Sequence, residues 1–303
     1  MTEIVTFGSA WSRFLEQVKN LSGPDNYINI ESIGRNYLLP AFENMKLCNM
    51  TFQDFQALLF SVRKKNGEPL AKKSISNIRG AIVQFSKYCE GCKIMSLPLS
   101  LLKTPKNAPR KGKVILQPEQ ARRLMNEFDD EWYINLWRWM MCTGMRPGEA
   151  LGLRWSDIRD GVVTINQAVN YRNRITDGKN ENARRRFSLN SILTQILNDQ
   201  KEKTWRLNSE YVFCSYAGKV SKQTVTKNSW DRIALALGSE TTPYGLRHTF
   251  ISYVSQSIPD QALKDLVGHS LRTDTYGIYR HAVNGEAEQT AKMVNIALVE
   301  KFF

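Results

Sequence analysis

The chain has 303 residues, with 42 Lys and Arg against 29 Asp and Glu, which gives a formal net charge of +13. This length is enough for two domains with separate cores, and the ordinary hydrophobic content of 42% excludes a disordered protein. The positive charge points to a polyanionic partner. Because the sequence has neither a long apolar run nor a basic amphipathic terminus, nucleic acid is favoured over a membrane surface.

The five cysteines are scattered along the chain, and the opening residues lack the basic start and apolar stretch of a signal peptide. These features predict a reduced, cytoplasmic protein. Cys89-Glu-Gly-Cys92 has the spacing of a metal or redox motif, but no second ligand pair accompanies it. We therefore interpret both cysteines as ordinary residues at a helix end and expect no metal site.

The first third of the chain, residues 1–103, is predicted to be a small helical domain. Apolar residues recur at helical spacing, and Gly23-Pro24-Asp25 and Asn66-Gly67-Glu68-Pro69 interrupt them. Helices are expected over residues 7–21, 30–42, 51–62 and 74–88. Four or five helices with short connections are typical of a helical bundle.

The last of these helices begins with a basic stretch. Lys72, Lys73 and Arg79 gather near its start, with Ser76 and Asn77 between them. A helix N-terminus that carries lysines and small polar groups suits contact with phosphate. A solvated basic face would contain the same residues, and the spacing alone does not separate the two interpretations.

Residues 104–114 are predicted to be a basic linker between two domains. The segment is rich in proline and lysine and has no apolar period. Its charge, which includes Lys111 and Lys113, indicates that it follows a nucleic-acid backbone.

The remaining residues, 115–303, are predicted to form a mixed α+β domain. Helices are expected over residues 121–128, 132–142, 189–197, 224–237, 246–255 and 260–266 and in an amphipathic segment at 286–303, with strands over 162–165 and 185–189. Residues 176–180 are rich in turn formers and are expected at a hairpin tip. Trp132, Trp137 and Trp139 are expected to pack in the protein rather than to stack on bases.

Residues with functional side chains are concentrated between 243 and 281. They include all three histidines, an arginine and two closely spaced tyrosines: His248, His269, His281, Arg247, Tyr276 and Tyr279. A cationic donor, an imidazole and a hydroxyl nucleophile suit chemistry at a phosphate ester, because its transition state spreads negative charge over oxygens. These residue types are also common in helix cores and on surfaces, so they do not decide the function alone.

A further candidate is Arg146, which lies between a helix end at Gly144 and a new helix start at Pro147. Such a break can aim a guanidinium group into a cleft, and its fork matches two phosphate oxygens. A surface arginine at a turn is the alternative interpretation.

Several motifs together resemble the tyrosine recombinase (phage integrase) family. Leu-Arg-His-Thr-Phe at 246–250, Gly-His-Ser at 268–270 and Ile-Tyr-Arg-His at 278–281 are similar to its C-terminal signature, and residues 143–158 are similar to its first arginine motif. The resemblance covers most of residues 115–283 and extends to the N-terminal third only in general character. It implies a mainly α protein: a helical core-binding domain and a mixed α+β catalytic domain with a small antiparallel sheet and a C-terminal tail helix, which together form a C-shaped clamp around duplex DNA.

The resemblance also implies roles for individual residues. Tyr279, preceded by an apolar residue and followed by the Arg-His pair, matches the nucleophile better than Tyr276. Two arginines and a histidine match the phosphate ligands, a lysine on a hairpin matches the general acid, and a glutamate matches the residue that orients the first arginine: Arg146, Arg247, His269, Lys179 and Glu149. The basic start of the fourth predicted helix matches the DNA-facing part of the core-binding domain, with Lys72, Lys73, Asn77 and Arg79.

One position departs from the family pattern. Three residues before Arg247 the family usually has histidine, whereas this chain has Tyr244. A tyrosine hydroxyl can donate a hydrogen bond to a phosphate oxygen, but with a reference pKa of about 10 it accepts a proton poorly at neutral pH. His248 is adjacent, but its place on the helix directs it elsewhere, and we expect a structural role for it.

The sequence therefore predicts a site-specific DNA recombinase that cleaves and rejoins DNA through a 3′-phosphotyrosyl intermediate, without metal, ATP or other cofactor. Resemblance to the family implies a homotetramer in the synaptic complex, held together by the C-terminal tail. A type IB topoisomerase shares the chemistry but rejoins the same strand, and a catalytically inactive DNA-binding protein is the second alternative.

Overall fold

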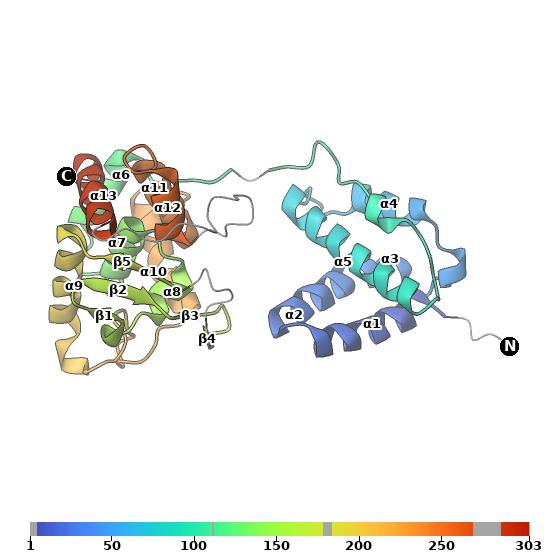
Figure 1. Cartoon of the computed structure of the whole chain (residues 1–303). Coiled ribbons are helices and arrows are strands. Elements are labelled where there is room, and N and C mark those ends of the chain that lie inside the picture. The colour runs from blue at the N-terminus through green and yellow to red at the C-terminus, as the bar shows by residue number, and fades with distance from the viewer. Residues whose placement is uncertain (1–4, 111, 178–183, 269–285, 303) are drawn as a thin grey trace. The chain divides into compact units, whose positions relative to one another are not determined.

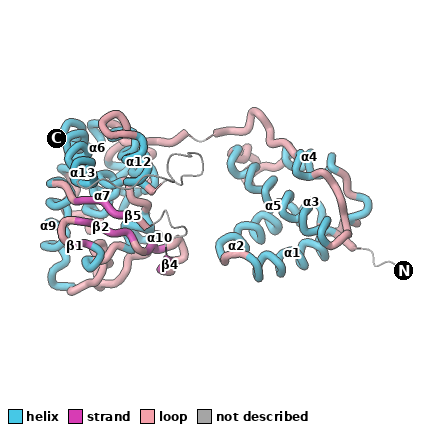
Figure 2. The backbone as a smooth tube through the Cα atoms, viewed as in Figure 1, coloured by secondary structure: helices cyan, strands magenta, loops and turns pink. Residues whose placement is uncertain are grey.

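A computed structural model describes residues 5–110, 112–177, 184–268 and 286–302 (Figure 1). The chain divides into two compact units, Met1–Gly112 and Lys113–Phe303. In the described part, strands are confined to the second unit, as Figure 2 shows. The prediction of a mainly helical protein with a small antiparallel sheet is confirmed.

The first unit is built from helices around an aromatic core. Its main elements are α1 (Phe7–Leu21), α2 (Pro24–Ile33), a π-helical turn (Gly34–Leu38), α3 (Leu39–Phe42), α4 (Phe52–Ser61) and α5 (Lys72–Gly91). The rings of Phe7 and Phe85 lie 4.9 Å apart, and Trp11 lies 5.3 Å from Phe85. The Thr51 side chain caps α4 by accepting from the Asp54 N–H, and the Asp54 carboxylate accepts from the Thr51 N–H, as in a capping box.

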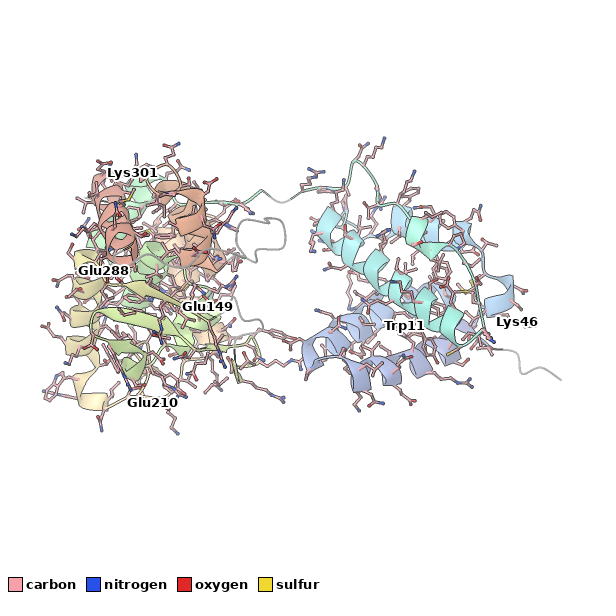
Figure 3. All side chains as sticks on the ribbon, viewed as in Figure 1. Trp11, Lys46, Glu149, Glu210, Glu288 and Lys301 are labelled. Carbon is pink, nitrogen blue, oxygen red and sulfur yellow. The ribbon has the colours of Figure 1, made fainter. Side chains whose placement is uncertain are left out.

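The second helix differs from the prediction. It begins at Pro24 rather than at residue 30, because proline at the first position of a helix needs no N–H partner and is already set to a helical φ. The predicted stretch to residue 42 is interrupted by the π-helical turn at Gly34. The indole of Trp11 occupies the space beside this glycine, where a Cβ would lie 2.3 Å from Trp11 Nε1 (Figure 3).

The second unit surrounds a helix that is buried on all sides. Its helices are α6 (Pro118–Asn126), α7 (Ile134–Thr143), α8 (Pro147–Gly152), α9 (Ser191–Thr204), α10 (Gln223–Ala236), α11 (Pro243–Val254), α12 (Asp260–Val267) and α13 (Glu286–Phe302). Every residue of α7 is buried. Trp137 and Trp139 lie in this core, as predicted, whereas Trp132 is only partly buried and stacks on Tyr216 at 4.2 Å.

The strands of the described residues form two small antiparallel sheets. β1 (Ile158–Arg159), β2 (Val162–Ile165) and β5 (Arg185–Ser188) form one sheet in the order β1-β2-β5, and β3 (Gln167–Val169) pairs with β4 (Ile175–Asp177). The two predicted strands do pair with each other. Two residues of the predicted hairpin tip, Thr176 and Asp177, belong to β4, which a tight turn at residues 170–174 joins to β3. The rest of that tip, residues 178–180, lies outside the described residues.

α13 lies against α6, α11 and β5 of its own unit (Figure 1). Four side chains on one face of the helix are buried: Val294, Ala297, Leu298 and Phe302. None of the helices in the described residues is long and apolar enough to cross a bilayer.

Candidate active site

Arg146 is aimed by the break between α7 and α8. Gly144 ends α7 in the left-handed region, at φ 64°, and a Cβ there would lie 2.5 Å from the ring of Phe250. Glycine is therefore required both by the backbone and by the close packing. Pro147 then starts α8 and leaves Arg146 as its N-cap, with its side chain 35% exposed.

Glu149, in the first turn of α8, is a fully bonded carboxylate. Oε1 accepts from Arg146 Nη1 at 2.6 Å and from Arg185 Nη1 at 3.2 Å. Oε2 accepts from the Arg146 backbone N–H at 2.9 Å and from Arg185 Nη2 at 2.8 Å. Figure 3 shows Glu149 inside the second unit. With four donors around it, the carboxylate is arranged to hold arginines and is unsuited to accept a proton.

The pKa of Glu149 depends on its burial and on the two arginines that bind it. Burial acts to raise the pKa, but the hydrogen bonds and positive charge of Arg185, together with those of Arg146, hold it below its ordinary value. Glu149 therefore stays ionised at neutral pH and remains a counter-charge for both guanidinium groups.

Arg247, on α11, is buried and bonded to backbone carbonyls. Nη1 donates to Gly144 O at 2.7 Å, and Nη2 donates to Val267 O at 2.6 Å. Burial, with the nearby positive charge of Arg146, lowers the pKa of Arg247 to about 10. The group is still a cation at neutral pH, and its position is fixed by the helix ends that it joins.

The end of α12 brings the arginines together. Its last carbonyls lack partners within the helix, and consecutive ones accept from three different guanidinium groups: Leu266 O from Arg185 Nε at 2.8 Å, Val267 O from Arg247, and Gly268 O from Arg146 Nη2 at 3.0 Å. Gly268 caps the helix in the left-handed region, at φ 66°. The negative end of the helix dipole thus lies in the cluster of cations.

Sequence reasoning missed Arg185. Three consecutive arginines, Arg184 to Arg186, stand at the start of the second predicted strand, and no separate role was assigned to any of them. In β5 the side chains alternate, so that Arg185 is buried while Arg186 is exposed. The period of two in a strand was the available signal.

Tyr244 lies in the first turn of α11, and its side chain is 43% exposed. It lines a cavity of about 420 Å³ together with Pro147 and Gly148 of α8 and Gln223 and Lys227 of α10. The centroids of its ring and the His248 ring lie 5.3 Å apart, in a T-shaped arrangement. Burial and the charges of Lys113 and Arg247 lower the pKa of His248, which favours the neutral imidazole.

The other predicted catalytic residues, Lys179, His269 and Tyr279, lie outside the described residues. The segments that lead to two of them are nonetheless fixed. His269 follows Gly268 directly. β4, which precedes the Lys179 segment, pairs with β3, and Val169 O of β3 accepts from Gln223 Nε2 at 2.6 Å.

The predicted DNA-contacting residues of the first unit lie on α5. Lys73 and Asn77 are exposed and Lys72 is partly buried in the first turns of this helix. Arg79 differs, because its guanidinium donates to the carbonyls of Ser100 and Leu102 and so ties α5 to the segment before the linker. Lys111 lies outside the described residues, and Lys113 is an exposed residue at the start of the second unit.

Comparison with known proteins extends these observations. The model of the phage integrase family matches residues 115–286. A curated relative, the tyrosine recombinase XerC-like protein of Caldanaerobacter subterraneus subsp. tengcongensis, is 21% identical over 336 aligned residues, which cover 96% of this chain and 83% of the relative.

Solved structures share the fold. The Tn1549 transposon integrase in complex with transposon right end DNA matches with a TM-score of 0.72 at 17% identity, covering 97% of this chain and 100% of that chain. A lambda integrase tetramer bound to a Holliday junction matches with a TM-score of 0.69 at 18% identity, covering 89% of this chain and 79% of that chain. More than half of the chain matches the family model, and the chain therefore belongs to the phage integrase family, the tyrosine recombinases.

Proposed function

We propose that this protein is a site-specific DNA recombinase in which Tyr279 attacks a phosphodiester of duplex DNA. The phenolic oxygen forms a bond to phosphorus, the bond from phosphorus to the 5′ oxygen breaks, and a 3′-phosphotyrosyl link remains. A 5′ hydroxyl of the partner duplex then attacks this link and releases Tyr279. The link retains the phosphodiester bond energy, so the exchange needs no ATP.

The observation that carries the proposal is the cluster of Arg146, Arg247 and Glu149 at the end of α12. A phosphoryl transition state gathers negative charge on its oxygens, and preorganised cations stabilise that charge without reorganising. The exposed edge of Arg146 offers N–H donors that Glu149 and Gly268 do not use. We assign Arg146, Arg247 and His269 to the phosphate, Lys179 to protonation of the leaving oxygen, and Tyr244 to a hydrogen bond with a non-bridging oxygen.

DNA binding is proposed to involve both units. Lys72, Lys73 and Asn77 at the start of α5 would contact phosphates, and the linker with Lys111 and Lys113 would follow the backbone between the units, so that the chain closes as a C-shaped clamp. Arg79 would support this surface from behind, because its donors hold residues 100–102. The net charge of +13 supports a polyanionic partner. A cytoplasmic location follows from access to DNA.

Assembly is proposed to use α13. The recombination of two duplexes through a four-way junction needs four protomers, and a tail helix that docks on a neighbour would link them. The groove between α6, α11 and β5 holds α13 within one chain. Because a neighbour's helix would make the same contacts in the same groove, exchange between protomers costs little contact energy.

A nicked suicide duplex tests the proposal. After cleavage, a short fragment diffuses away and traps the covalent protein–DNA adduct. The parent chain should form the adduct, and Tyr279→Phe should form none while binding duplex with similar affinity, because the change removes one hydroxyl. Tyr276→Phe is the matched control and should retain the adduct.

Two outcomes would contradict the proposal. Adduct formation by Tyr279→Phe but not by Tyr276→Phe would move the nucleophile, and no adduct from the parent would indicate an inactive DNA-binding protein. Product topology on DNA with two sites separates recombination from topoisomerase activity.

A further inference from the structure

Arg185 is a buried cation to which the proposed reaction assigns no step. It lies in β5, opposite Ile165 of β2, and its side chain is 6% exposed. Its neighbour Arg186 points to the other face of the strand and is exposed. A buried ion pair adds little net stability, because the loss of hydration offsets the attraction between the charges. The placement of Arg185 therefore calls for a role other than stability alone.

All three nitrogens of the Arg185 guanidinium are used. Nη1 and Nη2 form a fork that donates to the two oxygens of the Glu149 carboxylate, at 3.2 and 2.8 Å, and Nε donates to Leu266 O at 2.8 Å. The fork fixes the plane of the carboxylate as well as its position, which an ammonium group would not do. Glu149 in turn binds both the side chain and the backbone of Arg146.

Arg185 thus acts on one proposed phosphate ligand, Arg146, through Glu149. It also binds the end of α12 at Leu266, while Arg146 binds the same helix end at Gly268.

We propose that Arg185 is a positioning residue of the active site, which sets the guanidinium of Arg146 through the Glu149 carboxylate and holds the C-terminal end of α12 through the Leu266 carbonyl. The proposal rests on the proposed function. It adds a buried arginine to the two that are proposed to bind the phosphate.

Removal of Arg185 changes the ionisation of Glu149. Arg146 at the start of α8, Arg185 on β5 and Arg247 on α11 are the charged groups that face this carboxylate among the described residues, and α12 presents backbone carbonyls. Arg185 is the main group that lowers the pKa of Glu149, against burial, which raises it. Without Arg185 the pKa rises, so Glu149 becomes protonated as the pH falls and then releases Arg146.

The experiment measures single-turnover cleavage of the suicide duplex at saturating protein, from pH 5 to 9. Arg185→Gln should cleave about 100-fold more slowly at pH 7, as expected for a misplaced catalytic group, with the Kd for DNA within about threefold of the parent. Relative to the parent, its rate should also fall at acid pH, by up to tenfold per pH unit below the raised pKa of Glu149. Arg185→Gln/Glu149→Gln cannot titrate at this position and should lose that acid limb.

Two further variants complete the test. Arg186→Gln removes the same charge from the exposed face of the same strand and should cleave within about threefold of the parent. Arg185→Lys keeps the charge but not the forked pair of donors. It should therefore cleave more slowly than the parent, without the fall in rate at acid pH. It replaces Arg185→Gln in the test if that variant does not fold. Parent-like rates and pH profiles for Arg185→Gln, or for Arg185→Lys in its place, would overturn the proposal. Failure of the parent to form an adduct would instead refute the proposed function.

Discussion

At the scale of single residues, the ionisation states in the cluster determine which groups can act as acids or bases. The pKa of Arg247, about 10, lies about three units above neutral pH, so the guanidinium group remains protonated there. Glu149 is held ionised and already accepts four hydrogen bonds. Neither residue is therefore suited to accept the proton of a nucleophile, and both act through fixed charge.

Tyr244 is the residue whose chemistry differs most from the family pattern. Its exposed ring, in the first turn of α11, borders the cavity beside Pro147, one residue from Arg146. Because a phenol hydroxyl can donate a hydrogen bond, we propose that this residue serves as a donor to the phosphate.

Tyr244→Phe should slow cleavage of the suicide duplex by about 10²–10³, the cost of losing one oxyanion donor. Tyr244→His should retain or raise the rate, because imidazole supplies the donor again. Tyr253→Phe is the control on the same helix: it loses a hydroxyl that donates to Leu116 O at 2.7 Å, far along α11 from Tyr244, and should affect stability rather than cleavage. Cleavage by Tyr244→Phe at the parent rate would mean that the hydroxyl takes no part.

At the scale of elements, the sequence was most informative where a pattern is local. The helical periods, the break at Gly144-Met-Arg-Pro147 and the strands at residues 162–165 and 185–189 could all be predicted. The start of α2 at Pro24 and the extra β3–β4 pair could not, because proline and turn residues mark helix starts as well as breaks, and short strands carry little periodic signal.

The site was predictable only in part, for a similar reason. Arg146, Glu149 and Arg247 belong to local motifs. Arg185 joins them through contacts across 36 residues to Glu149 and 81 residues to Leu266, which no spacing along the chain encodes. Arg79 lies near Lys72 and Lys73 in sequence, but its guanidinium is bonded to the carbonyls of residues 100 and 102, which the spacing along the chain did not indicate.

Two glycines in helical segments of the first unit should respond to alanine in opposite directions. At Gly34 a Cβ would lie 2.3 Å from Trp11 Nε1, so Gly34→Ala should lower the free energy of unfolding by about 1–3 kcal/mol through overpacking. At Gly80, in α5, a Cβ would meet nothing within 4 Å, so Gly80→Ala should raise it by about 0.5–1 kcal/mol. Urea unfolding of both variants is the measurement, and equal effects of the two changes would contradict the packing of Trp11 on Gly34.

At the scale of the whole molecule, the net charge and the two-unit organisation of the chain determine how the proposed DNA binding depends on salt. The net charge of +13 is distributed over two units that have separate cores, joined through a segment rich in lysine and proline. In the proposed binding mode both units contact DNA phosphates, and each such contact releases counterions. The affinity for DNA should therefore depend steeply on salt, while cleavage at saturating DNA should not.

The contribution of the first unit can be isolated with two pairs of lysines. Lys72→Gln/Lys73→Gln removes two proposed phosphate contacts at the start of α5, so the log–log salt slope of binding should become shallower by about 1.8, at about 0.9 for each phosphate. Lys19→Gln/Lys87→Gln removes the same charge from exposed positions on α1 and the later part of α5 and should leave the slope within error of the parent. Fluorescence anisotropy of a labelled duplex gives the Kd at several salt concentrations between about 50 and about 300 mM. The slope of log Kd against log salt concentration follows from these values. Equal changes from the two pairs would mean that net charge alone governs binding, and an unchanged slope for Lys72→Gln/Lys73→Gln would remove the start of α5 from the DNA interface.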